Sequence, residues 1–482
     1  MNEMNSKRLP NYNPEEHTPK LADAFMTRRQ MLTRTGMGMG AATLGMMLGE
    51  QFYSNSAQAI ELGAAAGNPL AAKAAHFAAK AKHVIHIFAA GGPSHVDTWD
   101  HKPALEKYVD QVLPGTNGLS YPTAFKFSKR GKSGMEVSEV FPRLGNHVDD
   151  ICLIKSMWTD VPAHEPASKM MHTGSFQLPK PCAGAWTLYG LGFENQNMPG
   201  FISLGGKAEY RQSGFLPSMY QGVNVNYNQN MSLNQILLNI RNQFTSSDQQ
   251  TRQLELAKQL NDIHSENLHK EEQLESRIQS FEMAFKMQTE ATDAFDINKE
   301  SAETKSMYGV GTSDLAAKLL VARRLVERGV RFVQVFDGGW DMHGNLEASM
   351  RRKAANLDQP AAALIADLKR RGLLDSTLII WGGEFGRTVT RDKGGNANPG
   401  RDHNGRAFCT WMAGGGVKGG TSYGETDEFG ARAEVNRVHI HDLHATWMAL
   451  LGFDHKKLTY RYNGRDFRFT DNFGNVVKEV IA

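Results

Sequence analysis

The sequence predicts an α/β fold in which helices cover both faces of a mostly parallel central sheet. Short apolar runs typical of buried strands recur along the chain, and apolar stripes with helical spacing lie between some of them. Glycine-rich polar segments follow where several of these strands end. Strand–helix–strand units of this length favour parallel strands, and the ligands of such sheets gather at the carboxyl ends of the strands.

Four buried strands are predicted from the apolar runs. The first covers residues 83–90 and ends in the turn Gly91-Gly92-Pro93. The other three cover residues 330–336, 376–381 and 408–413 and have the same apolar character. We expect all four to lie in the central sheet.

Two helices are predicted around the second of these strands. Ser313 is placed to cap a helix whose apolar stripe runs through residues 315–326, and Gly329 ends it. A second stripe covers residues 357–368 and is followed by Gly372. Residues 249–292, rich in Gln, Glu and Lys, predict one or two amphipathic helices in an insertion at about 245–305.

Composition excludes several classes of protein. The chain has 54 Lys and Arg against 51 Asp and Glu, so its net charge of +3 argues against a dedicated nucleic-acid binder. Its three cysteines are too few for a disulfide framework. The composition is that of a large globular protein.

Residues 1–59 read as an export signal. Arg28 and Arg29 precede a weakly apolar stretch at 36–48, which is shorter than the about 20 residues of a membrane span. Ala57-Gln58-Ala59 has the A-x-A pattern of a cleavage site. We therefore expect the twin-arginine export machinery as a partner and a periplasmic or extracellular location. The mature chain, residues 60–482, is then a single domain without a stable membrane span.

Polar residues follow the predicted strands at positions that suit a metal site. His95 and Asp97 come after the first strand, although Asp97 also suits a helix cap. Asp341 and His343 follow the second strand, and His403 lies in a Gly/Asn-rich loop before the last. Carboxylate and imidazole groups are the ligands that divalent metals such as zinc or manganese take.

A second set of polar residues suits the binding of an anion. Glu384 and Arg387 lie in a glycine-rich loop after the third strand, where they form either a functional pair or a structural ion pair. The guanidinium of Arg387 matches a sulfate, phosphate or carboxylate group. Residues 164–174 add two histidines and Lys169, and Asp442 reads as the cap of a helix near the end of the chain.

The motifs resemble those of the bacterial "domain of unknown function 1501" family over nearly all of residues 60–482. The matching segments are GGPSHVDTWDHKP, GWDMHGN, GGEFGRT, GRDHN and HDLHATWMALLGFDHKKLTYRYNGRDFR. That family is similar to the alkaline phosphatase/sulfatase superfamily. The resemblance implies that superfamily's α/β fold, with one or two divalent cations at a sheet edge and a nucleophile that attacks a sulfate or phosphate ester.

The sequence departs from the sulfatase pattern at the residues that carry its chemistry. His164 occupies the position of the sulfatase nucleophile, and Ser168 that of the following arginine, with Lys169 next to it. The metal motif S-D-H-G appears as GEFG, which keeps an acid as Glu384 but replaces the histidine. The acidic pair of the first strand is absent. These departures favour one metal over two.

The expected function is an exported, metal-assisted hydrolase of sulfate or phosphate esters, with an anionic ester or glycan as substrate. The alternative is an exported glycan-binding or structural protein that has lost catalysis. The cofactor is a divalent ion such as Zn, Mn, Ca or Mg. Arg387 and Lys169 are expected to hold the anion, and His164 to act as nucleophile, general base or ligand. The expected metal site consists of Asp341, His343, Glu384 and His403, with Asp97 and His95 near it.

Overall fold

The described residues of this computed structural model are 71–195, 197–236, 292–392 and 398–482, together with Gln249, Arg252, Glu255 and Leu256. The chain divides into two units, one formed by Met1–Tyr53 with Asn239–Glu272 and the other by Ser54–Leu238 with Gln273–Ala482. All strands of the central sheet belong to the second unit. The predicted export signal and most of the helical insertion lie outside the described residues.

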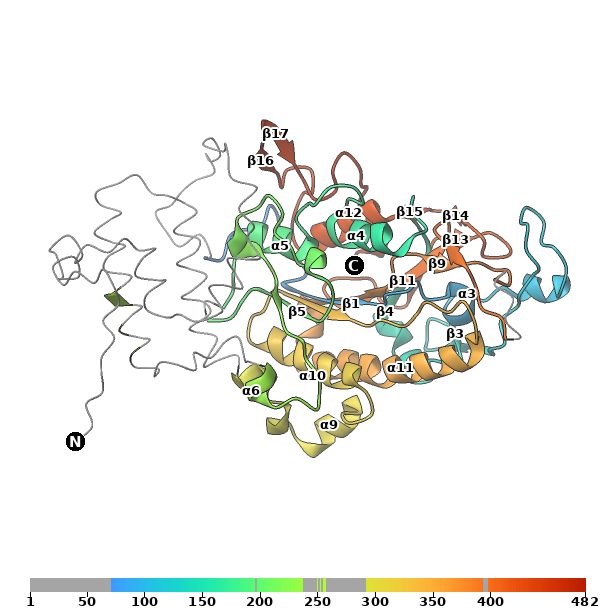
Figure 1. Cartoon of the computed structure of the whole chain (residues 1–482), viewed down its shortest axis with the longest axis horizontal. Helices are drawn as coiled ribbons and strands as arrows, with labels where there is room; N and C mark the ends of the chain where they lie inside the picture. The colour runs from blue at the N-terminus through green and yellow to red at the C-terminus, as the bar shows by residue number, and fades with distance from the viewer. Residues whose placement is uncertain are drawn as a thin grey trace, which may run out of the picture. The chain divides into compact units, whose positions relative to one another are not determined.

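A nine-stranded sheet forms the centre of this unit, in the order β12-β4-β11-β8-β1-β7-β5-β6, with β15 also paired to β4 (Figure 1). Its strands are β1 (His83–Phe88), β4 (Ile151–Trp158), β5 (Phe201–Leu204), β6 (Val223–Asn224), β7 (Phe332–Phe336), β8 (Thr377–Gly382), β11 (Phe408–Ala413), β12 (Thr421–Tyr423) and β15 (Val438–His439). All pairs are parallel except those of β11. The predicted mostly parallel sheet is therefore confirmed.

Strand β11 runs antiparallel to both of its neighbours, β8 and β4. In the described part of the connection from β8 to β11, the regular elements are the short strands β9 (Gly386–Arg387) and β10 (His403–Asn404). A parallel return to the sheet needs a long crossover, usually through a helix. Every residue of β11 is buried, so its sequence gives no sign of strand direction.

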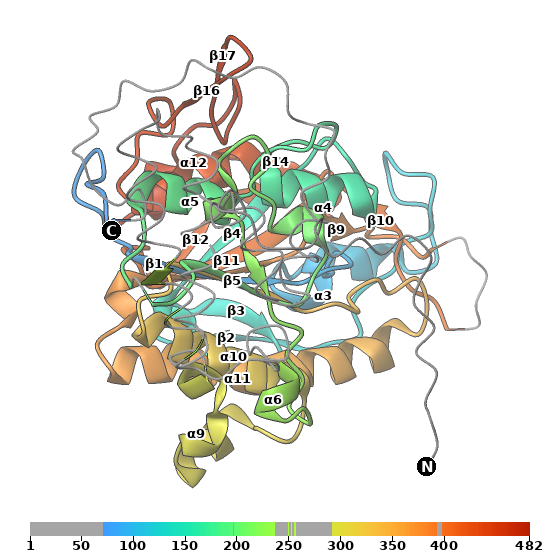
Figure 2. The same cartoon turned by 60° about the vertical axis from the view of Figure 1, so that its left-hand side comes forward.

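Helices cover both faces of the sheet, as predicted (Figures 1 and 2). One face carries α4 (His164–Thr173), α5 (Ala183–Leu191) and α12 (Ile440–Leu450), and the other α9 (Ala302–Tyr308), α10 (Asp314–Glu327) and α11 (Leu346–Arg370). The smaller elements are helices α3 (His95–Thr98) and α6 (Leu233–Ile236) and the strand pairs β2 (Phe127–Arg130) with β3 (Met135–Ser138), β13 (Glu425–Thr426) with β14 (Ala433–Val435), and β16 (Tyr460–Tyr462) with β17 (Arg465–Phe467).

The helix caps partly follow the prediction. The Ser313 hydroxyl accepts the Ala316 N–H at 3.2 Å and caps α10 as expected. The predicted cap of α12 is wrong, because His439 occupies that position and Asp442 lies three residues inside. The Asp442 carboxylate accepts the His439 N–H at 2.9 Å, which is the reciprocal half of a capping box.

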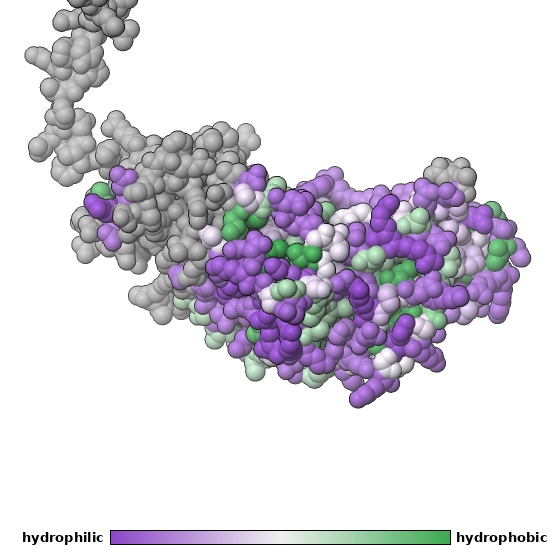
Figure 3. Space-filling view, turned by 90° about the horizontal axis from the view of Figure 1, so that it is seen from below, coloured by the Kyte–Doolittle hydropathy of each residue, from purple (hydrophilic) through white to green (hydrophobic). Residues whose placement is uncertain are grey.

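Apolar residues of the central strands make up the core of the unit. All residues of β1 and β8 are buried, and the face of the molecule seen from below is mostly hydrophilic with small apolar areas (Figure 3). None of the helices in the described ranges has the length and apolarity of a membrane span.

Candidate metal centre

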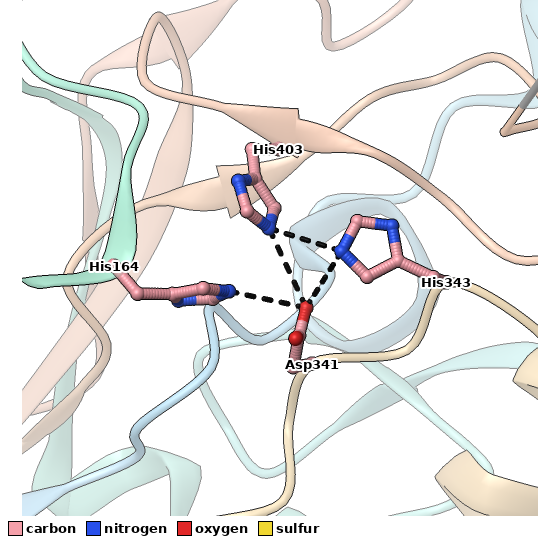
Figure 4. Close-up of side chains that lie close together, drawn as sticks. All are labelled: His164, Asp341, His343 and His403. Atoms are coloured by element: carbon pink, nitrogen blue, oxygen red, sulfur yellow. Dashed lines mark hydrogen bonds and ion pairs between the residues drawn. The ribbon is translucent and has the colours of Figure 1, made fainter.

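Four side chains from three segments meet at the carboxyl edge of the sheet (Figure 4). Asp341 and His343 lie in the loop after β7, His403 opens β10, and His164 is the first residue of α4. One ligand atom from each lies within 4.8 Å of all the others. The structure thus brings together three of the expected metal ligands and His164, which the sequence left with three alternative roles.

The Oδ1 atom of Asp341 is the centre of this cluster. The Nε2 atoms of His343, His164 and His403 lie 2.9, 3.2 and 3.5 Å from it, respectively. The Nε2 atoms of His343 and His403 are 3.1 Å apart. Three imidazole nitrogens and one carboxylate oxygen therefore point at one small volume.

The opposite nitrogen of each imidazole has a hydrogen-bond acceptor. His164 Nδ1 donates to Glu384 at 2.7 Å, and His343 Nδ1 donates to Asp392 at 2.6 Å. His403 Nδ1 donates to the carbonyl of Pro162 at 3.1 Å. Carboxylates and carbonyls only accept, so each Nδ1 carries a proton, and a ring that is neutral then presents its Nε2 lone pair to the cluster. This arrangement of outer partners is typical of metal-binding histidines.

The cluster is open to solvent on one side and closed on the other. The exposed fractions of the four side chains are 35% for His164, 44% for Asp341, 41% for His343 and 22% for His403. Glu384, behind His164, is 1% exposed. These four side chains would hold a metal on a side of the molecule that solvent reaches, as catalytic sites require.

Charges around the cluster keep Asp341 ionised. Burial acts to raise the pKa of Asp341, but the hydrogen bond and charge of Arg387, with the nearby histidines, outweigh it and lower the pKa to about 2. The hydrogen bond to Glu384 raises the pKa of His164, whereas burial and the charge of Arg387 lower the pKa of His403. The cluster therefore contains a permanent negative charge at neutral pH.

Two glycines let the loops pack closely around the cluster. Gly91 has φ +115°, and a Cβ there would lie 2.4 Å from the Asp341 nitrogen. A Cβ on Gly400 would lie 2.2 Å from the carbonyl carbon of His343. Any larger residue at either position therefore displaces the backbone that carries two of the ligands.

Arg387 joins the loops behind the cluster, and its three side-chain nitrogens all have partners. Nε donates to the carbonyl of Gly92 at 3.0 Å and Nη1 to that of Arg401 at 3.0 Å. Nη2 donates to the carbonyl of Gly91 and to Asp341. Arg387 is fully buried, so the expected contact with a substrate anion has no support in this geometry.

Lys169 is also engaged elsewhere. Its Nζ lies 2.9 Å from Glu165 and 3.6 Å from Glu209. These carboxylates compete with any anion for the ammonium group. The anion-binding role expected for Lys169 stays a prediction.

The other predicted ligands lie outside the four-residue cluster. Both oxygens of Asp97 accept from Arg401, at 2.7 and 3.1 Å, and the pair is fully buried. His95 Nε2 donates to the carbonyl of Gly430 at 2.7 Å. Glu384 accepts the Gly91 N–H at 3.0 and 3.2 Å as well as the proton of His164. Glu384 therefore lies one layer outside the cluster.

Sequence reasoning missed Asp392 and Pro162, the outer partners of His343 and His403. Asp392 lies in an irregular loop, and the Pro162 contact uses a backbone carbonyl, which every residue has. Neither position carries a motif. The only available signal was the presence of an acid near a predicted ligand, which is too common to select one residue.

Solved structures similar to this chain include sulfatases and members of the alkaline phosphatase superfamily. The PsFucS1 sulfatase of Pseudoalteromonas sp. is 13% identical over 78% of this chain and 68% of its own, with a TM-score of 0.35. A protein in the alkaline phosphatase superfamily from Vibrio parahaemolyticus is 10% identical over 80% and 70%, with a TM-score of 0.32. The lipoteichoic acid synthase LtaP of Listeria monocytogenes is 9% identical over 83% and 78%, with a TM-score of 0.34.

Structural similarities with TM-scores this low support no inference about the activity of this chain. No curated protein matches the chain significantly. A family model, in contrast, matches almost the whole of the second unit, over residues 81–481. The chain belongs to this family, which is described as "Protein of unknown function (DUF1501)".

Proposed function

We propose that this protein holds one divalent cation between His164, Asp341, His343 and His403 and hydrolyses sulfate or phosphate esters. One observation carries the proposal: three Nε2 atoms and a carboxylate oxygen converge, while every Nδ1 is held by an acceptor. The donor set favours zinc or manganese, because calcium and magnesium prefer sites made of oxygen atoms.

The protein's own residues have distinct roles in this proposal. Glu384 and Asp392 orient His164 and His343, and Arg387 fixes Asp341 through its buried guanidinium. His164 acts as a ligand rather than a nucleophile, because its Nε2 faces Asp341 at 3.2 Å. A bound divalent cation supplies Lewis acidity toward an ester oxygen and lowers the pKa of water.

The charge of the site suits an anionic substrate. The imidazoles are neutral when they present lone pairs, so a divalent ion and Asp341 together leave the four-residue cluster with one positive charge on its open side, while Glu384, Asp392 and Arg387 lie behind it. A positive cluster that is open to solvent attracts sulfate and phosphate groups. A sulfated or phosphorylated glycan is the proposed substrate class.

A second candidate function is that of an exported, non-catalytic protein that uses the metal for structure or binds glycans. It is favoured by the engagement of Arg387 with carbonyls and of Lys169 with carboxylates. Neither cation then holds a substrate. Release of sulfate or phosphate separates the two functions, because a binder retains the glycan unchanged.

The test combines metal analysis with assays on aryl sulfates and aryl phosphates, using the purified mature chain. The His343→Ala variant is expected to lose both the metal and the turnover, and His147→Ala, a histidine outside the cluster, to retain both. Turnover in the metal-free protein, or in His343→Ala, would overturn the proposal. Bound metal without turnover on any ester would leave the non-catalytic candidate.

The proposed location rests on residues 1–59, which we assign to the twin-arginine route from Arg28, Arg29 and the A-x-A segment. The paired change Arg28→Lys and Arg29→Lys is expected to keep the full-length chain in the cytoplasm. Cell fractionation measures this. Unchanged export of the double variant would contradict the assignment.

A further inference from the structure

Phe385 packs against two of the four proposed metal ligands. It lies between β8 and β9 and is fully buried. The centroid of its ring lies 4.9 Å from that of His164, at an interplanar angle of 36°, and 4.7 Å from that of His403, at 38°. The rings of His164 and His403, both drawn in Figure 4, are 4.3 Å apart at an angle of 73°. The three rings therefore form one packed group.

The backbone of Gly92 also lies against the Phe385 ring. Gly92 has φ +72°, and a Cβ there would lie 2.8 Å from two carbons of the ring and 3.0 Å from the Phe385 carbonyl oxygen. The ring thus fills the space beside Gly92. The carbonyl of Gly92 accepts from Arg387 Nε at 3.0 Å, which holds this backbone in place. Phe385 is therefore in contact with a fixed backbone segment as well as with the two imidazoles.

The outer hydrogen bonds fix only part of the orientation of these imidazoles. His164 Nδ1 donates to Glu384 at 2.7 Å, and His403 Nδ1 donates to the carbonyl of Pro162 at 3.1 Å. One hydrogen bond holds one ring atom and sets the tilt of the ring plane only loosely. A close-packed neighbouring ring resists a change of tilt, because a tilted imidazole would collide with it. Phe385 supplies this contact to both rings.

We infer that Phe385 is a positioning residue that holds the imidazoles of His164 and His403 in the orientation that a metal ion needs. Metal ligands keep their geometry when packing and outer hydrogen bonds lock their rotamers. Glu384 and Phe385 are consecutive and act on His164 in two ways, one through a hydrogen bond and the other through ring packing. The inference rests on the proposed metal centre and adds to it a residue that has no ligand atom.

The experiment compares Phe385→Leu with the wild type in zinc affinity and in the visible spectrum of the cobalt-loaded protein. Leucine keeps an apolar side chain but has no ring, so we expect zinc to bind about tenfold more weakly, the lower end of the effect of losing an outer partner. The cobalt bands should shift, since the two imidazoles no longer keep their angle. A role in core packing alone would leave the spectrum as it is in the wild type.

Phe332→Leu is the matched control. Phe332 is 1% exposed and opens β7, at the strand end opposite the loop that carries Asp341. Its ring packs on those of Phe201 and Trp447, at 5.0 and 6.0 Å. Both variants remove part of a buried ring, so both should be less stable than the wild type in urea. Zinc affinity and the cobalt spectrum of Phe332→Leu should match those of the wild type.

Two results would overturn the inference alone. Wild-type affinity and spectrum in Phe385→Leu would show that the imidazoles are oriented without the ring, and equal changes in Phe332→Leu would assign the effect to stability. If Phe385→Leu does not fold, Phe385→Met, which keeps much of the volume without a flat ring, takes its place and is judged by the same two measurements. A wild type that binds no zinc would instead overturn the metal centre, and this inference with it.

Discussion

The Nε2 atoms of His343 and His403 face each other at 3.1 Å, although each ring already donates its Nδ1 proton to another acceptor. Two lone pairs at this separation repel each other unless a cation or a proton lies between them. The nearby Asp341 oxygen and His164 Nε2 point into the same space. The fold therefore holds four ligand atoms around a common space in which a metal ion would bind all of them.

The outer carboxylate of Asp392 should tune the metal affinity. Asp392→Asn keeps an acceptor for His343 Nδ1 but removes its charge, so we expect zinc affinity to fall by about 10–100-fold. Competition with a chromophoric chelator measures this change. Asp466→Asn, an exposed acid paired with Arg461, is the control and should leave the affinity unaltered. An unaffected Asp392→Asn protein would show that the ring is oriented by other means.

Glu384→Gln distinguishes an outer partner from a direct ligand. The structure places Glu384 on His164 Nδ1 and the Gly91 N–H, so the variant should bind metal about 10–100-fold more weakly and keep its coordination geometry. Cobalt substitution reports that geometry through its visible absorption spectrum. Complete loss of binding, or a different spectrum, would make Glu384 itself a ligand.

The ion pair of Asp97 with Arg401 should matter for stability rather than for metal binding. Both side chains are fully buried, so Asp97→Ala leaves an uncompensated guanidinium and should reduce the free energy of unfolding by about 3–5 kcal/mol. Urea denaturation measures the loss, and metal analysis of the folded variant should still find one ion. A stable variant that has lost its metal would restore Asp97 as a ligand.

His172 should make the fold sensitive to acid. Burial lowers the pKa of His172 to about 4, while in the unfolded chain it is about 6.5. Above pH 6.5 the ring is neutral in both states and has no effect on stability. Between pH 6.5 and 4 the unfolded state takes up the proton first, so stability falls by up to about 3 kcal/mol.

The unfolding free energy measured from pH 7 to pH 4.5 tests this. In the wild type the ring donates to the Ser168 carbonyl and faces the Gln334 amide, and it stacks on Tyr210. His172→Phe keeps the stacking but not the titration, so its stability should fall less steeply with acid. Parallel curves for the two proteins would mean that other groups carry the pH dependence.

Much of the fold could be predicted because its central elements are buried and clearly bounded. Strands β1, β7 and β8 are short apolar runs between polar turns, and Ser313 marks the start of α10. Helix α11 begins at Leu346, well before the predicted stripe, because exposed charged residues such as Glu347 and Arg351 conceal its first turns. The direction of β11 depends on its connection, which no local pattern encodes.

The location of the site could be predicted from the sequence, but the division into ligands and outer partners could not. Asp341 and His343 follow the parallel strand β7, and His403 precedes β11, whose antiparallel direction brings its start to the same edge. Spacing cannot say which polar group faces the centre and which supports it from behind. Glu384 accepts the His164 proton, and Arg387 donates to backbone carbonyls. Both contacts depend on the close packing of the loops, which Gly91 allows.

The most direct test is an anomalous difference map at the zinc absorption edge from crystals of the zinc-loaded protein. We expect one peak per chain, about 2.0–2.2 Å from the Nε2 atoms of His164, His343 and His403 and from an Asp341 oxygen. A zinc-loaded crystal with no peak among these four side chains would contradict it.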